Sequence, residues 1–405
     1  MWYVETPQLR IDPDAGRCDI DVVRHQGICK IMNTPILMTP GPVGVSSNVL
    51  AAAAYPVLPH YGPTWMPIYE ETCSMLKQLF GTINDIVIMP GPGTGALETA
   101  ITSTVSRDST AFIPKNGYFS ERLEQITVAN GINVVAPEFP KERSIDVSLL
   151  AELVQKAVVD CRRNGHPLVA LVVVHVETST GVINPLEDIA KIAHEHNLFL
   201  IVDAVAAMGG VKLPVDEWKI DICVTVPNKC IASLAGVALM SVSERSWAAA
   251  LANPCTGWYL NLTTWADYRR RWAGWFPYPT TLPTNIVLAL NYALTDIFNE
   301  GLDAFQKKFE KAATKVRHEM GQFGLQLFPN PDSAAPVLSA FTIPKGISSV
   351  DILNSLYNSQ ILAAGGIDDL KGKIIRIGHM GEAQSSQAIA TLTAAMETYF
   401  NSKKS

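Results

Sequence analysis

The sequence predicts an α/β protein with a large domain, built on a mainly parallel sheet sandwiched by helices, and a smaller C-terminal α+β domain. The first observation is that continuous apolar runs alternate with amphipathic helical patterns from Ile86 onward. The second is that 405 residues, 48% of them hydrophobic, suffice for a large core. The third is a change to shorter, mixed patterns near residue 300.

The expected elements follow one another as strands and helices. Strands are predicted at 86–91, 110–115, 132–139, 168–178, 198–207, 220–229 and 236–243. Helices are predicted at 93–106, 119–131, 146–163 and 185–197, and a long helical segment begins at Asn285. The last part adds strands at 338–344 and 373–379 and helices at 349–359 and 385–400.

Three regions follow from this pattern. Residues 1–37 form an N-terminal extension or arm, residues 38–300 the large domain, and residues 301–405 the small domain.

Composition excludes several classes of protein. A net charge of −6 with scattered basic residues gives no footprint for nucleic acid. Seven cysteines without paired C-x-x-C spacing favour a reduced compartment and indicate no metal site. No apolar stretch is long enough to span a membrane, and the N-terminus lacks a signal-peptide pattern, so we expect a cytoplasmic protein.

The chemically informative residues are those where apolar runs stop, because ligands of open parallel sheets bind at the carboxyl ends of the strands. The first group is Gly93, Thr94 and Gly95 in PGPGTGALE, where glycines and a helix N-terminus suit a phosphate. An ordinary strand-to-helix turn explains the same residues equally well.

Three further strand ends carry Thr178, Asp203 and Lys229. Each alone is explained as a loop or capping residue. Together, a phosphate cradle, then a carboxylate, then a lysine about 26 residues further on is the order that pyridoxal phosphate chemistry requires. In that chemistry the lysine forms a Schiff base, the aspartate keeps the pyridine nitrogen protonated, and the helix N-terminus holds the phosphate.

The chain resembles the class V aminotransferases of fold type I, and in particular the alanine-glyoxylate and serine-pyruvate aminotransferase group. The resemblance begins near Thr39 and extends to the C-terminus. It rests on the ordered motifs TPGPVGV, PGPGTGALE, NGYFSER, HVETSTGVINPLE, IVDAVAAMGG, VTVPNKC, YPTTLPT and KIIRIGHMG.

The resemblance implies pyridoxal 5'-phosphate as the cofactor and assigns residues to it. Asn228 helps Gly93, Thr94 and Gly95 to hold the phosphate. Phe119 stacks on the ring and Val205 packs on its opposite face. Thr178 bonds the phenolic oxygen, and Asp203 bonds the ring nitrogen.

The resemblance also implies how substrates are held. Arg376 of RIGHMG matches the arginine that grips the substrate α-carboxylate. Tyr278 and Thr281 match residues that reach the phosphate of a second subunit, so a homodimer with shared active sites is implied. A Pro-rich surface loop explains these two residues as well.

The activity implied is transfer of an amino group from a small amino acid such as alanine or serine to a 2-oxo acid such as glyoxylate or pyruvate. Lys229 acts as general base and then general acid. Gly41, His60 and Tyr61 are expected at the substrate pocket, although Tyr61 stands where many relatives have arginine.

Two other enzyme activities and one binding role remain alternatives. PNKC and RIGHMG resemble the pyridoxamine-pyruvate aminotransferase branch, although the GTG cradle looks intact. Lyases of the cysteine-desulfurase type share the fold and the lysine, but they have histidine where Phe119 stands. A binding protein without turnover is the third alternative, against which the retention of lysine, aspartate, cradle and arginine argues.

Overall fold

The computed structural model describes residues 35–253 and 257–403, which belong to one compact unit, Pro35–Ser405. Most of the extension predicted for residues 1–37 lies outside the described residues. Its last residues form β1 (Ile36–Leu37), which pairs in parallel with β13 (Ile361–Leu362).

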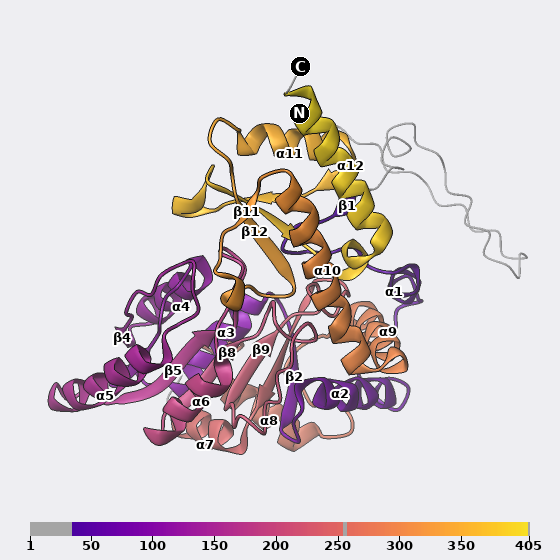
Figure 1. The fold of residues 1–405 in the computed structure, drawn as a ribbon. Coiled ribbons are helices and arrows are strands. Elements are labelled where there is room, and N and C mark those ends of the chain that lie inside the picture. Colours follow the sequence, from indigo (N-terminus) through magenta and orange to yellow (C-terminus); the bar gives the residue numbers. More distant parts are fainter. Residues whose placement is uncertain (1–34, 254–256, 404–405) are drawn as a thin grey trace, which may run out of the picture. The chain divides into compact units, whose positions relative to one another are not determined.

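The large sheet has seven strands in the order β2-β10-β9-β8-β5-β3-β4 (Figure 1). The prediction of a mainly parallel sheet is confirmed, with β10 (Val237–Val242) antiparallel to both of its neighbours. The other strands are β2 (Asp85–Pro90), β3 (Thr110–Phe112), β4 (Asn133–Val135), β5 (Leu168–Val174), β8 (Phe199–Asp203) and β9 (Ile222–Thr225).

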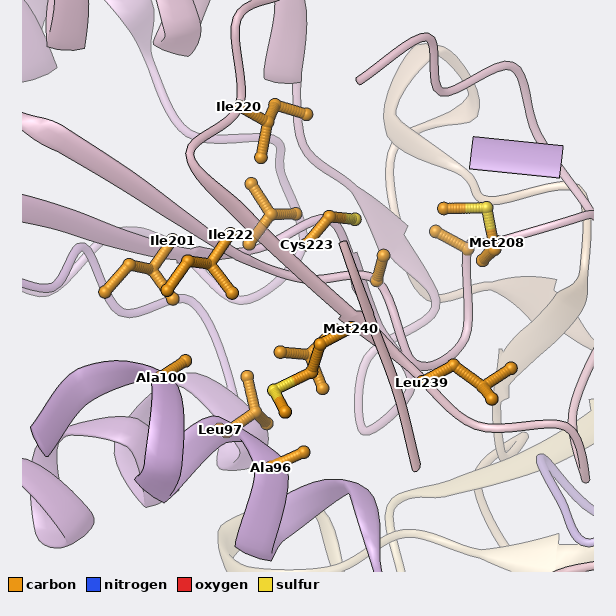
Figure 2. Packing of buried hydrophobic residues seen from close by; sticks show 14 of the residues in the cluster. Ala96, Leu97, Ala100, Ile201, Met208, Ile220, Ile222, Cys223, Leu239 and Met240 are labelled. Carbon is orange, nitrogen blue, oxygen red and sulfur yellow. The ribbon is translucent and has the colours of Figure 1, made fainter. Parts of the chain in front are cut away.

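Helices pack against this sheet because its apolar strands must be shielded from water. Helix α3 (Gly93–Thr104) contacts β8, β9 and β10, and Figure 2 shows its Leu97 close to Met240 of β10. The remaining helices of this part are α1 (Ser47–Ala53), α2 (Met66–Phe80), α4 (Tyr118–Ala129), α5 (Val147–Arg163), α6 (Leu186–Glu195), α7 (Glu244–Ala252), α8 (Leu262–Trp272) and α9 (Thr284–Glu300).

A second, antiparallel sheet has the strand order β11-β12-β15-β14. Its hydrophobic cluster, which includes Phe341 and Ile377, is separate from the cluster of the large sheet. The predicted domain boundary near residue 300 stays a prediction. The elements here are α10 (Leu302–Gln322), β11 (Gln326–Leu327), β12 (Leu338–Thr342), α11 (Ser349–Asn358), β14 (Ala364–Gly365), β15 (Ile374–Gly378), α12 (Ser386–Ser402) and three short 3-10 turns (Pro331–Ser333, Asp368–Leu370, Gly381–Gln384).

Parallel neighbours in the large sheet bring their carboxyl ends to one edge. Strand β8 ends at Asp203, and the segment after β9 leads to Lys229. Strand β5 is followed by the hairpin of β6 (Val176–Glu177) and β7 (Val182–Ile183). Within the described ranges, no helix is both long enough and apolar enough to cross a membrane.

Candidate active site

A cavity of about 460 Å³ opens at the carboxyl ends of these strands. This volume lies within the range of small-molecule and cofactor sites. The structure brings eight of the residues singled out from the sequence to its walls: Gly93, Thr94, Phe119, Thr178, Asp203, Val205, Asn228 and Lys229.

Lys229 is a largely buried amine at this cavity. Its Nζ donates a hydrogen bond to the Pro40 carbonyl. Burial lowers the pKa of Lys229 to about 8, and the positive charge of Arg376 acts in the same direction. A substantial fraction of the amine is therefore neutral near pH 8, as a nucleophile or proton acceptor must be.

Asp203 is a carboxylate with only 6% of its surface exposed. Its Oδ1 accepts a hydrogen bond of 2.9 Å from the Val205 backbone N–H, and Oδ2 has no hydrogen-bond donor among the described residues. Burial raises the pKa of Asp203 to about 6, although the Val205 bond and the charges of Lys229 and Arg122 oppose the rise. The carboxylate is still ionised at pH 7 and suits a cationic ring nitrogen as partner.

The first turn of α3 forms the cradle predicted for a phosphate. Its N-cap is Pro92, and no side chain in the described ranges caps this end of the helix. A Cβ on Gly93 would lie 2.9 Å from Val226 and 3.0 Å from Val205, so only glycine fits there without displacement. Uncapped N–H groups and a favourable dipole beside a cavity match an anionic group. Gly95 belongs to this turn but does not line the cavity.

Arg376 lies on β15. It does not line the cavity itself but donates a hydrogen bond to the backbone of Thr178, which does. The side chain is buried, and two backbone carbonyls fix its guanidinium plane. Nε donates to the Gly365 oxygen at 2.8 Å, and Nη1 donates to the Thr178 oxygen at 3.0 Å. The predicted grip on a substrate carboxylate stays a prediction.

Gly41, His60, Tyr61, Tyr278 and Thr281 do not line the cavity. Gly41 lies against the Lys229 side chain. Tyr278 is fully buried; its hydroxyl accepts from Trp65 Nε1 at 2.6 Å and donates to the His60 carbonyl. Thr281 is exposed. The predicted roles of Tyr278 and Thr281 toward a second subunit stay predictions.

His60 and Tyr61 belong to an aromatic group next to Tyr278. The His60 ring contacts Phe276 at 5.4 Å between centroids, and the Tyr61 ring contacts Trp275 at 5.7 Å. Their predicted place in a substrate pocket stays a prediction.

Sequence reasoning missed two charged residues near the cavity. Arg122 lines it, with its guanidinium carbon 4.8 Å from the centre of the Phe119 ring. Phe119 and Arg122 are three positions apart on α4, a spacing that puts them on the same face of the helix. Arg122 could therefore have been predicted near the cavity once Phe119 was placed there. Glu177 is fully buried beside Thr178, and an acidic residue at the end of an apolar run was the corresponding signal.

The chain is similar in sequence and fold to known proteins. Residues 49–368 match the family model described as aminotransferase class-V. The chain is 33% identical over 361 residues to an aminotransferase of Methanocaldococcus jannaschii, with 88% of this chain and 90% of the relative covered. It is 30% identical over 363 residues to pyridoxamine–pyruvate transaminase of Mesorhizobium japonicum, covering 89% and 90% of the two chains. The crystal structure of ureidoglycine-glyoxylate aminotransferase from Bacillus subtilis superposes with a TM-score of 0.85 at 29% identity, covering 92% of this chain and 94% of that one.

Proposed function

Because the chain belongs to the class V aminotransferases, which are pyridoxal-phosphate-dependent enzymes of fold type I, we propose that it transfers the amino group of a small amino acid to glyoxylate or pyruvate. Alanine and serine are the donors proposed. The observation that carries the proposal is the convergence of Lys229, Asp203 and the first turn of α3 on one cavity.

The residues of the cavity fit pyridoxal phosphate. When bound, the cofactor supplies an electron sink that stabilises negative charge at the α-carbon of the amino acid. The first turn of α3 would hold the phosphate with help from Asn228. Phe119 and Val205 would cover the two ring faces, and Thr178 would bond the phenolic oxygen.

Three side chains would perform the chemistry. Burial lowers the pKa of Lys229 to about 8. Its amine would take the proton from the substrate α-carbon as a general base and then give the proton back as a general acid. Asp203 would hold a proton on the ring nitrogen. Arg376 would orient the substrate through its carboxylate, since its guanidinium plane is already fixed by two carbonyls.

A pyridoxamine–pyruvate type of activity is the second candidate. The PNKC and RIGHMG motifs favour it, as does the similarity to the Mesorhizobium japonicum enzyme. In that case free pyridoxamine would be the donor, and the phosphate cradle would have no phosphate to hold. The uncapped first turn of α3 is the feature that favours the first candidate.

Spectroscopy of the purified protein distinguishes the candidates. We expect a visible absorbance band from bound pyridoxal phosphate that is lost on adding one small amino acid and restored by glyoxylate or pyruvate. The Lys229→Ala variant should lack this cycle. Transfer from free pyridoxamine to pyruvate by protein without bound pyridoxal phosphate would establish the second candidate instead, and no transfer from any amine would refute both.

We further propose that the chain acts as a homodimer. Tyr61, Trp272 and Trp275, here called the aromatic patch, are each 45–49% exposed, and Tyr61 contacts Trp275. Clusters of exposed aromatic side chains such as the aromatic patch are typical of protein interfaces. Sedimentation should show a dimer that Trp275→Glu converts to monomers, and a monomeric wild-type enzyme with full activity would contradict the proposal. The cytoplasmic location stays a prediction from the sequence.

A further inference from the structure

We propose that Glu177 is a positioning residue that holds Phe119 over the cofactor site and ties it to Arg376. The proposal rests on the proposed role of Phe119 as the residue that stacks on the cofactor ring. It concerns a carboxylate that does not itself line the cavity.

The Glu177 carboxylate is fully buried and hydrogen-bonded through both oxygens. Oε2 accepts from the backbone N–H of Phe119 at 3.0 Å and from that of Ser120 at 3.1 Å. Oε1 accepts from the backbone N–H of Ser179 at 3.0 Å and from its hydroxyl at 2.6 Å. Two of these four donors belong to the first turn of α4, and one of them is the backbone of Phe119 itself.

These bonds set where α4 begins. An anionic oxygen at a helix N-terminus is favoured by the unpaired N–H groups and by the helix dipole. The approach is close: a Cβ on Gly117 would lie 2.6 Å from Glu177 Cδ and 2.6 Å from Ser179 Oγ. Glycine at 117 therefore allows the β6–β7 hairpin to pack closely against the start of α4. The hydrogen bond from the Phe119 N–H to the carboxylate fixes the position of Phe119 relative to β6.

The same hairpin holds the substrate arginine. The residue after Glu177 is Thr178, whose carbonyl accepts the hydrogen bond from Arg376 Nη1 at 3.0 Å. The Glu177 carbonyl accepts from the Gly181 N–H at 2.8 Å, which closes the turn. A displacement of Glu177 would therefore disturb both the Phe119 ring and the Arg376 guanidinium.

A general stabilising role explains these contacts less well. Burial raises the pKa of Glu177, and in the described ranges no cation forms an ion pair with it. Burying a carboxylate that has no ion-pair partner is unfavourable for stability unless hydrogen-bond donors surround it. The four donors compensate the charge only with this one geometry, which is what a positioning role requires.

A double-mutant cycle tests the proposal. The dissociation constant of pyridoxal phosphate is measured on the full-length protein after cofactor removal, by tryptophan fluorescence, for wild type, Glu177→Gln, Phe119→Ala and the double variant. Circular dichroism in the visible band reports the ring environment. We expect Glu177→Gln to weaken binding by about 10- to 100-fold and to reduce the visible signal, because hydrogen bonds to a charged group are lost. In the Phe119→Ala background the same change should weaken binding by less than about threefold.

Asp221 offers a matched control. Like Glu177, it is a buried carboxylate that does not line the cavity. Its partners are different: it accepts from the Leu200 N–H at 2.8 Å and pairs with Arg245 at 3.5 Å. Asp221→Asn should lower the melting temperature and leave the cofactor dissociation constant unchanged. Should Glu177→Gln fail to fold, Ser179→Ala removes the hydroxyl bond to Oε1 and the bond that this hydroxyl accepts from the Tyr118 N–H at 3.0 Å. The carboxylate keeps its three bonds from backbone N–H groups, so this variant should give a smaller loss in the same direction.

Two results would overturn the proposal. If the effects of Glu177→Gln and Phe119→Ala multiply in the double variant, Glu177 does not act through Phe119. If Glu177→Gln binds the cofactor as wild type does, the carboxylate is not a positioning residue. Failure of Phe119→Ala to weaken binding would instead remove the platform role of Phe119, and a wild-type protein that binds no cofactor would refute the proposed function itself.

Discussion

Lys229 and Gly41 lie in direct contact. A Cβ on Gly41 would lie 2.6 Å from Lys229 Nζ and 2.7 Å from Cε, and the backbone φ of Gly41 is +111°. The preceding residue, Pro40, supplies the carbonyl that accepts the hydrogen bond from Nζ. The loop after β1 therefore sets the position of the amine, and only glycine leaves room for it.

Substitution of Gly41 should displace the lysine. We expect Gly41→Ala to weaken cofactor binding by at least about tenfold, because a contact at 2.6 Å cannot be accommodated without moving the side chain or the loop. Titration of the visible absorbance with pyridoxal phosphate measures this. Gly301→Ala is the control, since Gly301 also has a positive φ, +90°, but nothing within 4 Å of a built Cβ. Equal losses in both variants would show that backbone strain, not the contact with Lys229, is responsible.

Arg376 should tolerate no replacement by lysine. Its Nε and Nη1 donate to two different carbonyls, and an ammonium group cannot reproduce that planar fork. We expect Arg376→Lys to lower kcat/KM for the amino donor by about 10- to 1,000-fold, since up to two charge-assisted bonds are lost. Cofactor affinity should change much less. A variant that loses cofactor and substrate binding equally would indicate disruption of the hairpin instead of loss of substrate recognition.

The sequence was sufficient to predict the large sheet because its strands are continuous apolar runs, and the cavity because their polar ends meet at one edge. It could not show that β10 runs antiparallel, since a buried strand looks the same in either direction. The contact between Lys229 and Gly41 joins segments 188 positions apart, and no local pattern encodes it.

Tyr278 and Glu177 also make contacts between distant segments that no local sequence pattern encodes. A tyrosine in a Pro-rich segment has the pattern of a loop residue, yet Trp65 and His60 from a distant segment enclose its hydroxyl. Glu177 appears as one more polar residue in HVETSTG, and only the folded hairpin shows that it binds the backbone of Phe119. Long-range packing decides both cases.

Asp203 should destabilise the protein when no cofactor is bound. Burial raises its pKa from 3.8 to about 6. Above pH 6 the carboxylate is ionised in both the folded and the unfolded state, but ionisation costs more free energy in the folded state, so the folded state is destabilised. We expect Asp203→Asn to stabilise the cofactor-free protein by about 1–3 kcal/mol at pH 7.5, and the gain to disappear as the pH falls from 6 toward 4. Thermal unfolding of both proteins across this range measures the effect.

The same variant should lose cofactor chemistry, because an amide does not hold a proton on the ring nitrogen. Stabilisation that persists unchanged at pH 4 would mean that the introduced amide improves packing and that the charge of Asp203 is not the cause. Such a result would also contradict the raised pKa of the carboxylate.

The reactivity of Lys229 should depend on pH with a midpoint near 8. Burial is the main cause of the lowered pKa; the charge of Arg376 lowers it further, whereas the charge of Asp203 raises it. The neutral amine is the reactive form, so labelling of Lys229 by an amine reagent in the cofactor-free protein should rise through pH 8 and level off above it. Asp203→Asn should move the midpoint down, and Arg376→Gln should move it up, because the first removes a negative and the second a positive charge. Peptide mass spectrometry gives the labelling of this residue alone. A midpoint that stays near the ordinary lysine value of 10.5 would show that water reaches the amine freely. The neutral fraction of Lys229 near pH 8 would then be no larger than that of a lysine on the surface.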